Sequence, residues 1–184
     1  MPLTNQTLKL FKQGNVFFET GSSMGGGIYE ALNVGFEKII SIEIEQKFID
    51  VCTNRFSNEV ASGRVQIIKG DTLKIMGDII EKINEPITFW LDAHWDGDGV
   101  HGENLCPIFE ELAFIKNHPI KNHLILIDDM RCMGDRSNGW GCDIQREKII
   151  EIIKKINPEY KISYTNGDLT HPAYINDIMV SYIN

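Results

Sequence analysis

The stretch Val16-Phe-Phe-Glu-Thr-Gly-Ser-Ser-Met-Gly-Gly-Gly27 decides the fold of this chain. An apolar run leads into an acidic residue and a glycine-rich turn, and a helix is predicted to begin near Ile28. Glycine allows positive φ and close approach of the backbone to a ligand, and the first turn of a helix presents unpaired N–H groups. This order predicts a cofactor-binding loop at the carboxyl edge of a sheet. Glu19, before the first glycine, suits hydroxyls or a cation better than a pyrophosphate.

Outward from this stretch, strand-like and helix-like segments alternate. The predicted strands cover residues 16–18, 38–43, 65–69, 87–91, 123–127, 160–164 and 177–183. The predicted helices cover residues 28–34, 46–57, 72–83, 108–116 and 144–156. Alternation of this kind indicates the α/β class, with a doubly wound, mostly parallel sheet and helices on both faces. Because the last two strands have no helix between them, we expect seven strands that close with a hairpin, the last strand antiparallel.

Composition and charge narrow the classes of function. Residues 1–184 are predicted to form a single domain, with 42% hydrophobic and 24% charged residues. The net charge of −8 disfavours a nucleic-acid partner, because such proteins carry a basic patch. No apolar run approaches the ~20 residues of a membrane span, and the first residues lack the pattern of a secretory signal. We therefore expect a cytoplasmic protein without a membrane span; the oligomeric state is left open, a homo-oligomer included.

Acidic residues follow every predicted parallel strand. They are Glu19, Glu43, Asp71, Asp92 and the pair Asp128-Asp129. The carboxyl ends of parallel strands share one edge of a sheet, so these carboxylates are expected to converge. Burying several carboxylates together is costly unless donors or a metal compensate. A single acid at such a position is as often a helix N-cap, but acids at five strand ends favour a shared site.

Glu43 lies about 20 residues beyond the glycine-rich loop, a spacing that suits an acid accepting hydrogen bonds from ribose hydroxyls. Glu45 is the alternative for this role. The nicotinamide fingerprint G-x-G-x-x-G is absent, since the loop reads G-S-S-M-G-G-G. An NAD-dependent oxidoreductase therefore stays only as a less favoured alternative.

Four stretches together resemble the class I S-adenosylmethionine-dependent methyltransferases: Phe18-Glu-Thr-Gly-Ser-Ser-Met-Gly25, Ser41-Ile-Glu43, Lys69-Gly-Asp-Thr72 and Trp90-Leu-Asp92. The resemblance implies a Rossmann-like methyltransferase fold and S-adenosylmethionine as cofactor. It implies that the methionine part is held by Glu19, Gly21, Ser22, Ser23 and Gly25. It implies Glu43 for the ribose and Asp71 with Thr72 near the base. Ile44 and Asp92 complete the predicted cofactor-binding set. Ser23 replaces a glycine that is frequent in this family.

The acids after the fourth and fifth strands resemble those of the metal-dependent O-methyltransferases of sugar and catechol type. This resemblance implies Asp92, Asp128 and Asp129 as ligands of Mg²⁺ or another divalent cation, which prefers oxygen ligands. It implies that the metal lowers the pKa of an acceptor hydroxyl and aims the oxyanion at the sulfonium methyl group. The alternative for Asp128 and Asp129 is a turn with one solvated acid and one cap.

His94 completes the predicted catalytic set with Asp92 and Asp128. A neutral imidazole there is a candidate general base or metal ligand; the alternative is a histidine that fixes its loop. For Arg131, pairing within the acidic cluster is favoured over binding a substrate anion. The long loops 93–107 and 132–143 follow strand ends and are predicted to be functional.

Three further stretches are similar to a small methyltransferase-like group without a settled substrate: Trp90-Leu-Asp-Ala-His-Trp95, Cys106-Pro-Ile-Phe-Glu-Glu-Leu112 and Leu126-Ile-Asp-Asp-Met-Arg131. The predicted partner is a small-molecule or saccharide hydroxyl acceptor. An S-adenosylmethionine-binding regulatory or partner-dependent protein, without methyl transfer of its own, is the alternative from another class.

Overall fold

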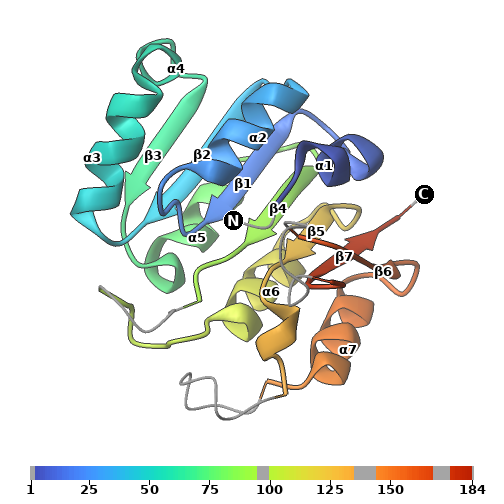
Figure 1. Ribbon diagram of the computed structural model, residues 1–184. Helices are drawn as coiled ribbons and strands as arrows, with labels where there is room; N and C mark the ends of the chain where they lie inside the picture. The colour runs from blue at the N-terminus through green and yellow to red at the C-terminus, as the bar shows by residue number, and fades with distance from the viewer. Residues whose placement is uncertain (1–2, 95–99, 135–143, 168–174, 184) are drawn as a thin grey trace.

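The computed structural model describes residues 3–94, 100–134, 144–167 and 175–183. Within them, seven strands form one sheet in the order β3-β2-β1-β4-β5-β7-β6 (Figure 1). The strands are β1 (Val16–Thr20), β2 (Lys38–Glu43), β3 (Val65–Lys69), β4 (Ile87–Leu91), β5 (Leu124–Ile127), β6 (Lys161–Thr165) and β7 (Ile178–Tyr182).

The pairing of the strands confirms the predicted architecture. β1 to β5 pair in parallel, whereas β7 is antiparallel to both of its neighbours, β5 and β6. The chain leaves β1 toward β2 and β3 on one side and continues with β4 and β5 on the other, so the order reverses beside β1. In open α/β sheets, ligands bind at the carboxyl ends of the strands at such a reversal.

Helices cover both faces of the sheet (Figure 1). They are α1 (Asn5–Phe11), α2 (Gly26–Val34), α3 (Gln46–Arg55), α4 (Ser57–Ala61), α5 (Thr72–Ile80), α6 (Ile108–Asn117), the 3₁₀ turn η1 (Met130–Cys132) and α7 (Arg146–Ile156). Side chains of α1, α2 and α3 pack on one face, and those of α5, α6 and α7 pack on the other. Two hydrophobic cores result, one on each face of the sheet. Among the described helices, none has the length and apolar character needed to cross a membrane.

The structure corrects two details of the predicted elements. The seven-residue helix α1 was not predicted; Thr4 caps it by accepting a hydrogen bond from the N–H of Thr7. The predicted helix 46–57 is interrupted at Phe56, whose ψ of 34° lies outside the helical region. Phe56 ends α3 and packs beneath the glycine-rich loop, where it lies next to Gly25.

Candidate active site

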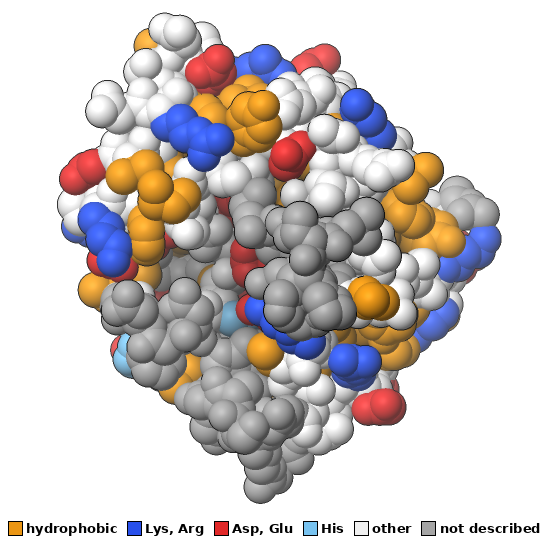
Figure 2. Space-filling model, in the orientation of Figure 1, with side chains coloured by type: hydrophobic (Ala, Val, Ile, Leu, Met, Phe, Trp, Pro, Cys, Tyr) orange, Lys and Arg blue, Asp and Glu red, His pale blue; other side chains and the backbone are white. Residues whose placement is uncertain are grey.

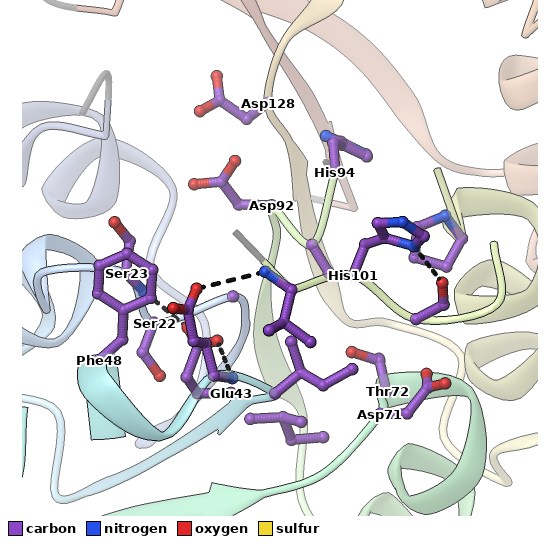
Figure 3. Close-up of a pocket in the computed structure, with 18 of the residues that line it drawn as sticks. Ser22, Ser23, Glu43, Phe48, Asp71, Thr72, Asp92, His94, His101 and Asp128 are labelled. Atoms are coloured by element: carbon purple, nitrogen blue, oxygen red, sulfur yellow. Dashed lines mark hydrogen bonds between the residues drawn. The ribbon is translucent and has the colours of Figure 1, made fainter. Parts of the chain in front are cut away.

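A cavity of about 530 Å³ opens at the carboxyl edge of the sheet. Figure 2 shows acidic side chains and a histidine in a hollow of this face, and Figure 3 shows the wall of the cavity. The cavity brings together most of the predicted site residues: Gly21, Ser22, Ser23, Glu43, Ile44, Asp71, Thr72, Asp92, His94, Asp128 and Asp129. Glu19 and Gly25 are not in its wall. Glu19 is buried against Ser41 and Gly27, and Gly25 packs on Phe56.

The glycine-rich loop passes close to the end of β4. Gly21 has a φ of 83°, and a Cβ there would lie 2.6 Å from the carbonyl oxygen of Asp92. Only glycine therefore allows this approach. Ser23 has a φ of 45°, an unfavourable conformation for a residue with a side chain. Its carbonyl accepts a hydrogen bond from the thiol of Cys52, and its N–H donates to Glu43.

Glu43 connects the loop after β1 to the loop after β2. One carboxylate oxygen accepts from the N–H of Ser23 and the other from the N–H of Glu45, both at 2.9 Å (Figure 3). A carboxylate oxygen accepts more than one hydrogen bond, and Glu43 also lines the cavity. This geometry keeps the carboxylate fixed with lone pairs left for hydroxyl groups of a ligand.

Asp71 acts as a helix cap in the structure. Its Oδ1 accepts from the N–H of Leu73 at 3.0 Å, which satisfies the first turn of α5. Lys74 lies 3.8 Å from its other oxygen, and a Cβ on Gly102 would lie 2.9 Å from that same oxygen. Asp71 is thus a helix N-cap, which was the alternative considered for each single acid. The cofactor-binding roles of Asp71 and Thr72 stay predictions.

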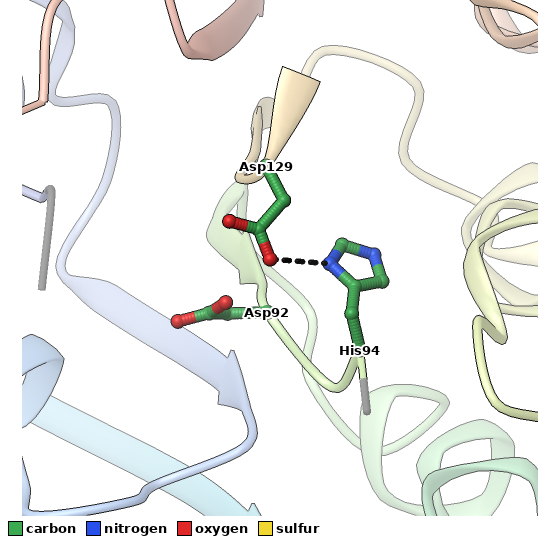
Figure 4. Close-up of side chains that lie close together, drawn as sticks. All are labelled: Asp92, His94 and Asp129. Carbon is green, nitrogen blue, oxygen red and sulfur yellow. Dashed lines mark ion pairs between the residues drawn. The ribbon is translucent and has the colours of Figure 1, made fainter. Parts of the chain in front are cut away.

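An acidic cluster with a histidine forms the other end of the cavity. Ligand atoms of Asp92, His94 and Asp129 lie within 4.8 Å of one another, as do those of Asp128, Asp129 and Asp177. His94 Nδ1 lies 3.7 Å from a carboxylate oxygen of Asp129 (Figure 4). Asp128 lies in the second group, and the first group holds His94 with Asp92 and Asp129. The metal-binding roles of Asp92, Asp128 and Asp129 stay predictions.

Burial and mutual repulsion shift the pKa values of these acids. Burial, Asp128 and Asp129 raise the pKa of Asp92 well above its ordinary value, and burial and Asp129 raise that of Asp128 to about 7. Burial also acts to raise the pKa of Asp129, but His94 and Arg131 lower it overall. Burial acts to lower the pKa of His94, but Cys106 and Asp129 raise it overall. The site thus holds more carboxylates than positive charges.

Arg131 binds carboxylates of the acidic cluster, as the sequence analysis predicted. Its guanidinium lies 2.7 Å from Asp129 and also forms an ion pair with Asp177, which is 1% exposed. The backbone N–H of Arg131 donates to the same carboxylate of Asp177 at 2.8 Å. Asp177, just before β7, was not predicted; it joins the segment after β5 to β7.

Sequence reasoning also missed Glu111 of α6. Its side chain is fully buried. Neither carboxylate oxygen accepts a hydrogen bond from the residues that the structure describes. Burial raises its pKa to about 7, against the lowering effects of His94 and Thr20. The signal was present: Glu111 has the helical spacing of the buried residues Ile108 and Ile115, so it is an acid on an apolar face.

Comparison with known sequences gives one partial relative. No family model matches the chain. A protein of Methanospirillum hungatei named "Probable ribosomal RNA small subunit methyltransferase A" is 32% identical over 87 residues, which cover 42% of this chain and 33% of that protein. The alignment thus spans about a third of the length of this curated relative.

Comparison with solved structures identifies the fold. The O-methyltransferase TomG of Streptomyces achromogenes, in complex with S-adenosylmethionine, has a TM-score of 0.64 and 12% identity, over 98% of this chain and 77% of that chain. An O-methyltransferase of Bacillus cereus, in complex with S-adenosylhomocysteine, has a TM-score of 0.65 and 13% identity, over 97% of this chain and 78% of that chain. The chain therefore has the class I methyltransferase fold.

Proposed function

We propose that this chain transfers the methyl group of S-adenosylmethionine to a hydroxyl of a small molecule or saccharide, assisted by a divalent cation. The observation that carries the proposal is the shared cavity, whose wall holds both the glycine-rich loop and the cluster of Asp92, His94 and Asp129. A cofactor held by the loop would place its reactive end toward a site that holds the acceptor, and such orientation is a large part of catalysis.

The residues of the first half of the cavity fit the cofactor. Gly21 keeps open a space that a Cβ would fill, and Glu43 offers fixed acceptors to ribose hydroxyls. Ile44 and Thr72 add lining to the same wall. These features match a nucleoside with an extended side chain.

The second half of the cavity fits a divalent cation. Two carboxylates and one imidazole converge, and burial together with repulsion among the acids raises the pKa values of Asp92 and Asp128. A bound cation would offset the repulsion among these acids. Carboxylate oxygens suit Mn²⁺ as well as Mg²⁺, so Mn²⁺ is included with Mg²⁺ in the proposal. When bound, such a cation supplies a Lewis acid that lowers the pKa of a hydroxyl beside it.

The chain's own residues position these groups. Asp129 holds His94 by its ion pair and is itself held by Arg131. The N–H of Asp92 donates to the carbonyl of Thr20 at 3.2 Å, which fixes the start of the loop after β4 against β1. We assign His94 as a ligand or as the base that receives the hydroxyl proton.

Calorimetry tests the two halves separately. We expect S-adenosylhomocysteine to bind the wild-type protein; no measurable binding would contradict the cofactor assignment. We expect Mn²⁺ to bind, and Asp129→Asn to weaken its binding by at least about tenfold, since a charged ligand is lost. Asp78→Asn, an exposed acid on α5, is the matched control and should leave Mn²⁺ binding unchanged. Equal Mn²⁺ affinity of Asp129→Asn and wild type would remove the metal from the proposal.

Two alternatives remain as competing outcomes. The name of the partial relative favours RNA as a methyl acceptor, whereas the net charge of −8 opposes it. A cofactor-binding protein without methyl transfer is the second alternative. Incubation with radiolabelled S-adenosylmethionine and a cell extract, followed by separation of RNA, protein and small molecules, distinguishes the three. Label in the small-molecule or saccharide fraction supports the proposal, label in RNA supports the first alternative, and no transfer supports the second.

A further inference from the structure

Asp129 belongs to both groups of ligand-type side chains at the carboxyl edge of the sheet. Its Oδ2 faces His94 in the first group, which also holds Asp92 (Figure 4). The second group consists of Asp129, Asp128 and Asp177. Enzymes with two metal ions hold the ions about 3.5–4 Å apart, close enough to share one carboxylate. By their positions alone, these acids would therefore suit two neighbouring cations.

A positive charge of the protein already lies in the second group. Nη2 of Arg131 lies 2.7 Å from Oδ1 of Asp129, and Nη1 of Arg131 donates to Oδ2 of Asp177. A guanidinium is always charged in proteins, and its planar set of N–H groups suits carboxylates on two sides. The second group thus contains a fixed monovalent cation that belongs to the chain itself.

The backbone around Arg131 fixes this cation in place. The N–H of Arg131 donates to Oδ1 of Asp177 at 2.8 Å, and the N–H of Met130 donates to the carbonyl oxygen of Asp177 at 2.9 Å. The guanidinium of Arg146 donates to the carbonyl oxygen of Met130 at 3.1 Å. The side chain of Asp177 is fully buried and is not part of the cavity wall, whereas Arg131 is. Since a buried carboxylate needs a compensating charge, Asp177 and Arg131 hold each other.

We propose that the guanidinium of Arg131 takes the place of a second cation, so that the cluster accepts one divalent cation, beside Asp92 and Asp129, and not two. The first cation rests on the proposed function; the occupation of the second group does not. The inference assigns Arg131 as the residue that sets the number of cations and Asp177 as the residue that positions it. One cation suits methyl transfer to a hydroxyl, because the leaving group is a neutral thioether that needs no metal.

The electrostatics of the second group agree with this assignment. Burial acts to lower the pKa of Arg131, but Asp129 and Asp177 raise it overall, so the positive charge is retained. Burial and Asp129 raise the pKa of Asp128, and Asp177 adds to this effect. Without the guanidinium, three neighbouring carboxylates would repel one another, and a metal ion would offset that repulsion.

Removal of the guanidinium tests the inference. Arg131→Met keeps an unbranched side chain without its charge, and we expect it to bind one more Mn²⁺ per chain than the wild type in calorimetry. Where both groups are filled, electron paramagnetic resonance should show magnetic coupling between two Mn²⁺ ions, which a merely structural change does not produce. Arg131→Lys keeps a positive charge and should bind the same number of ions as the wild type.

A second measurement covers the stability of the variant. Because Asp177 loses its partner, Arg131→Met should unfold at a lower temperature than the wild type. Added Mn²⁺ should then raise the unfolding temperature of Arg131→Met more than that of the wild type, since an additional ion binds the folded state. Combining Arg131→Met with Asp177→Asn removes an acid of the second group and should restore the wild-type number of ions.

Arg55→Met is the matched control. Arg55 also lines the cavity, but its guanidinium donates to the carbonyl oxygen of Met24, so the number of ions should not change. The inference is overturned if Arg131→Met binds as many Mn²⁺ ions as the wild type and gains no additional thermal stability from them. Two ions in the wild type would also overturn it. If the wild type binds none and Arg131→Met binds one, the metal of the proposed function is wrong, whereas the inference about Arg131 holds.

Discussion

Buried polar groups have different surroundings at the two edges of the sheet, where the strands begin and where they end. At the amino edge, the N–H of Ile87 donates to Nδ1 of His123 at 3.0 Å, so the hydrogen of His123 is on Nε2. That hydrogen is donated to Nδ1 of His118 at 3.0 Å. Nε2 of His118 then donates to the carbonyl oxygens of Ile80 and Ile83. Each ring nitrogen has a partner, as expected for the structural histidines of a core.

At the carboxyl edge, several buried acids instead lie close to one another. Burial raises the pKa values of Asp128 and Glu111 to about 7, whereas at the amino edge burial lowers the pKa of His123 to about 3. Polar groups satisfied within the protein stabilise the fold. Clusters of acids with shifted pKa values are typical of binding sites. The comparison predicts that substitutions at the amino edge destabilise the protein and that substitutions at the carboxyl edge stabilise it while impairing ligand binding.

The largest effect on stability is expected for His123→Phe. Phenylalanine fills the space of the ring but leaves the N–H of Ile87 buried without its acceptor and removes the donor to His118. We expect the free energy of unfolding to fall by about 3 kcal/mol at pH 7, measured by urea denaturation. His101→Phe, at an exposed histidine, is the control and should change it by less than about 0.5 kcal/mol.

The pH dependence checks the same residue. Since the folded pKa of His123 is below that of the unfolded chain, the unfolded state binds more protons between about pH 3 and pH 6.5. The contribution of His123 to stability is therefore present above about pH 6.5 and is lost as the pH falls through this window. His123→Phe should lack that loss, and an unchanged pH profile would contradict the assignment of His123 as a buried neutral group.

The next effect has the opposite sign, at the carboxyl edge. Asp128→Asn keeps the oxygen that accepts from the N–H of Asp129 at 2.8 Å but removes the need to ionise a buried carboxyl group. The folded pKa of Asp128 lies above the unfolded value, so the wild type loses stability as the pH rises from about 4 to 7. We expect Asp128→Asn to be more stable than wild type by roughly 2 kcal/mol at pH 8 and to show no gain at pH 4. A gain of equal size at both pH values would show that charge is not its cause.

A smaller gain is expected for Glu111→Met. Methionine has a similar length, is apolar, and suits the buried face of α6. The carboxyl group of Glu111 accepts no hydrogen bond from the described residues. We therefore expect an increase of about 1 kcal/mol in the free energy of unfolding at pH 8. Ile108→Met, a swap of similar volume at a buried position of the same helix, is the control for repacking and should not stabilise. A clear loss in Glu111→Met would mean that the carboxyl group is satisfied in solution.

The sequence predicted the two edges unequally. Regular patterns predicted the strands and the carboxyl edge, since glycines and strand-end acids are local features that a parallel sheet brings together. The sequence could not predict which side chains pair across the sheet. The hydrogen bond of Ser41 to Glu19 depends on the register of the strands, and the approach of Asp177 to Arg131 depends on the docking of β7. The hydrogen bonds of His118 likewise followed only from the fold.

The smallest effect concerns backbone strain at the carboxyl edge. Ser23 is exposed and has a φ of 45°. Glycine adopts this conformation without a Cβ penalty, although it also makes the unfolded chain more flexible. We therefore expect Ser23→Gly to raise the free energy of unfolding by only about 0.5 kcal/mol, measured by thermal and urea denaturation. Asn176→Gly, at a φ of 55°, is the control; asparagine tolerates this region, so no gain is expected there. A loss of stability in Ser23→Gly would instead show that the serine side chain stabilises the loop, and the strain would then not be a feature of this edge.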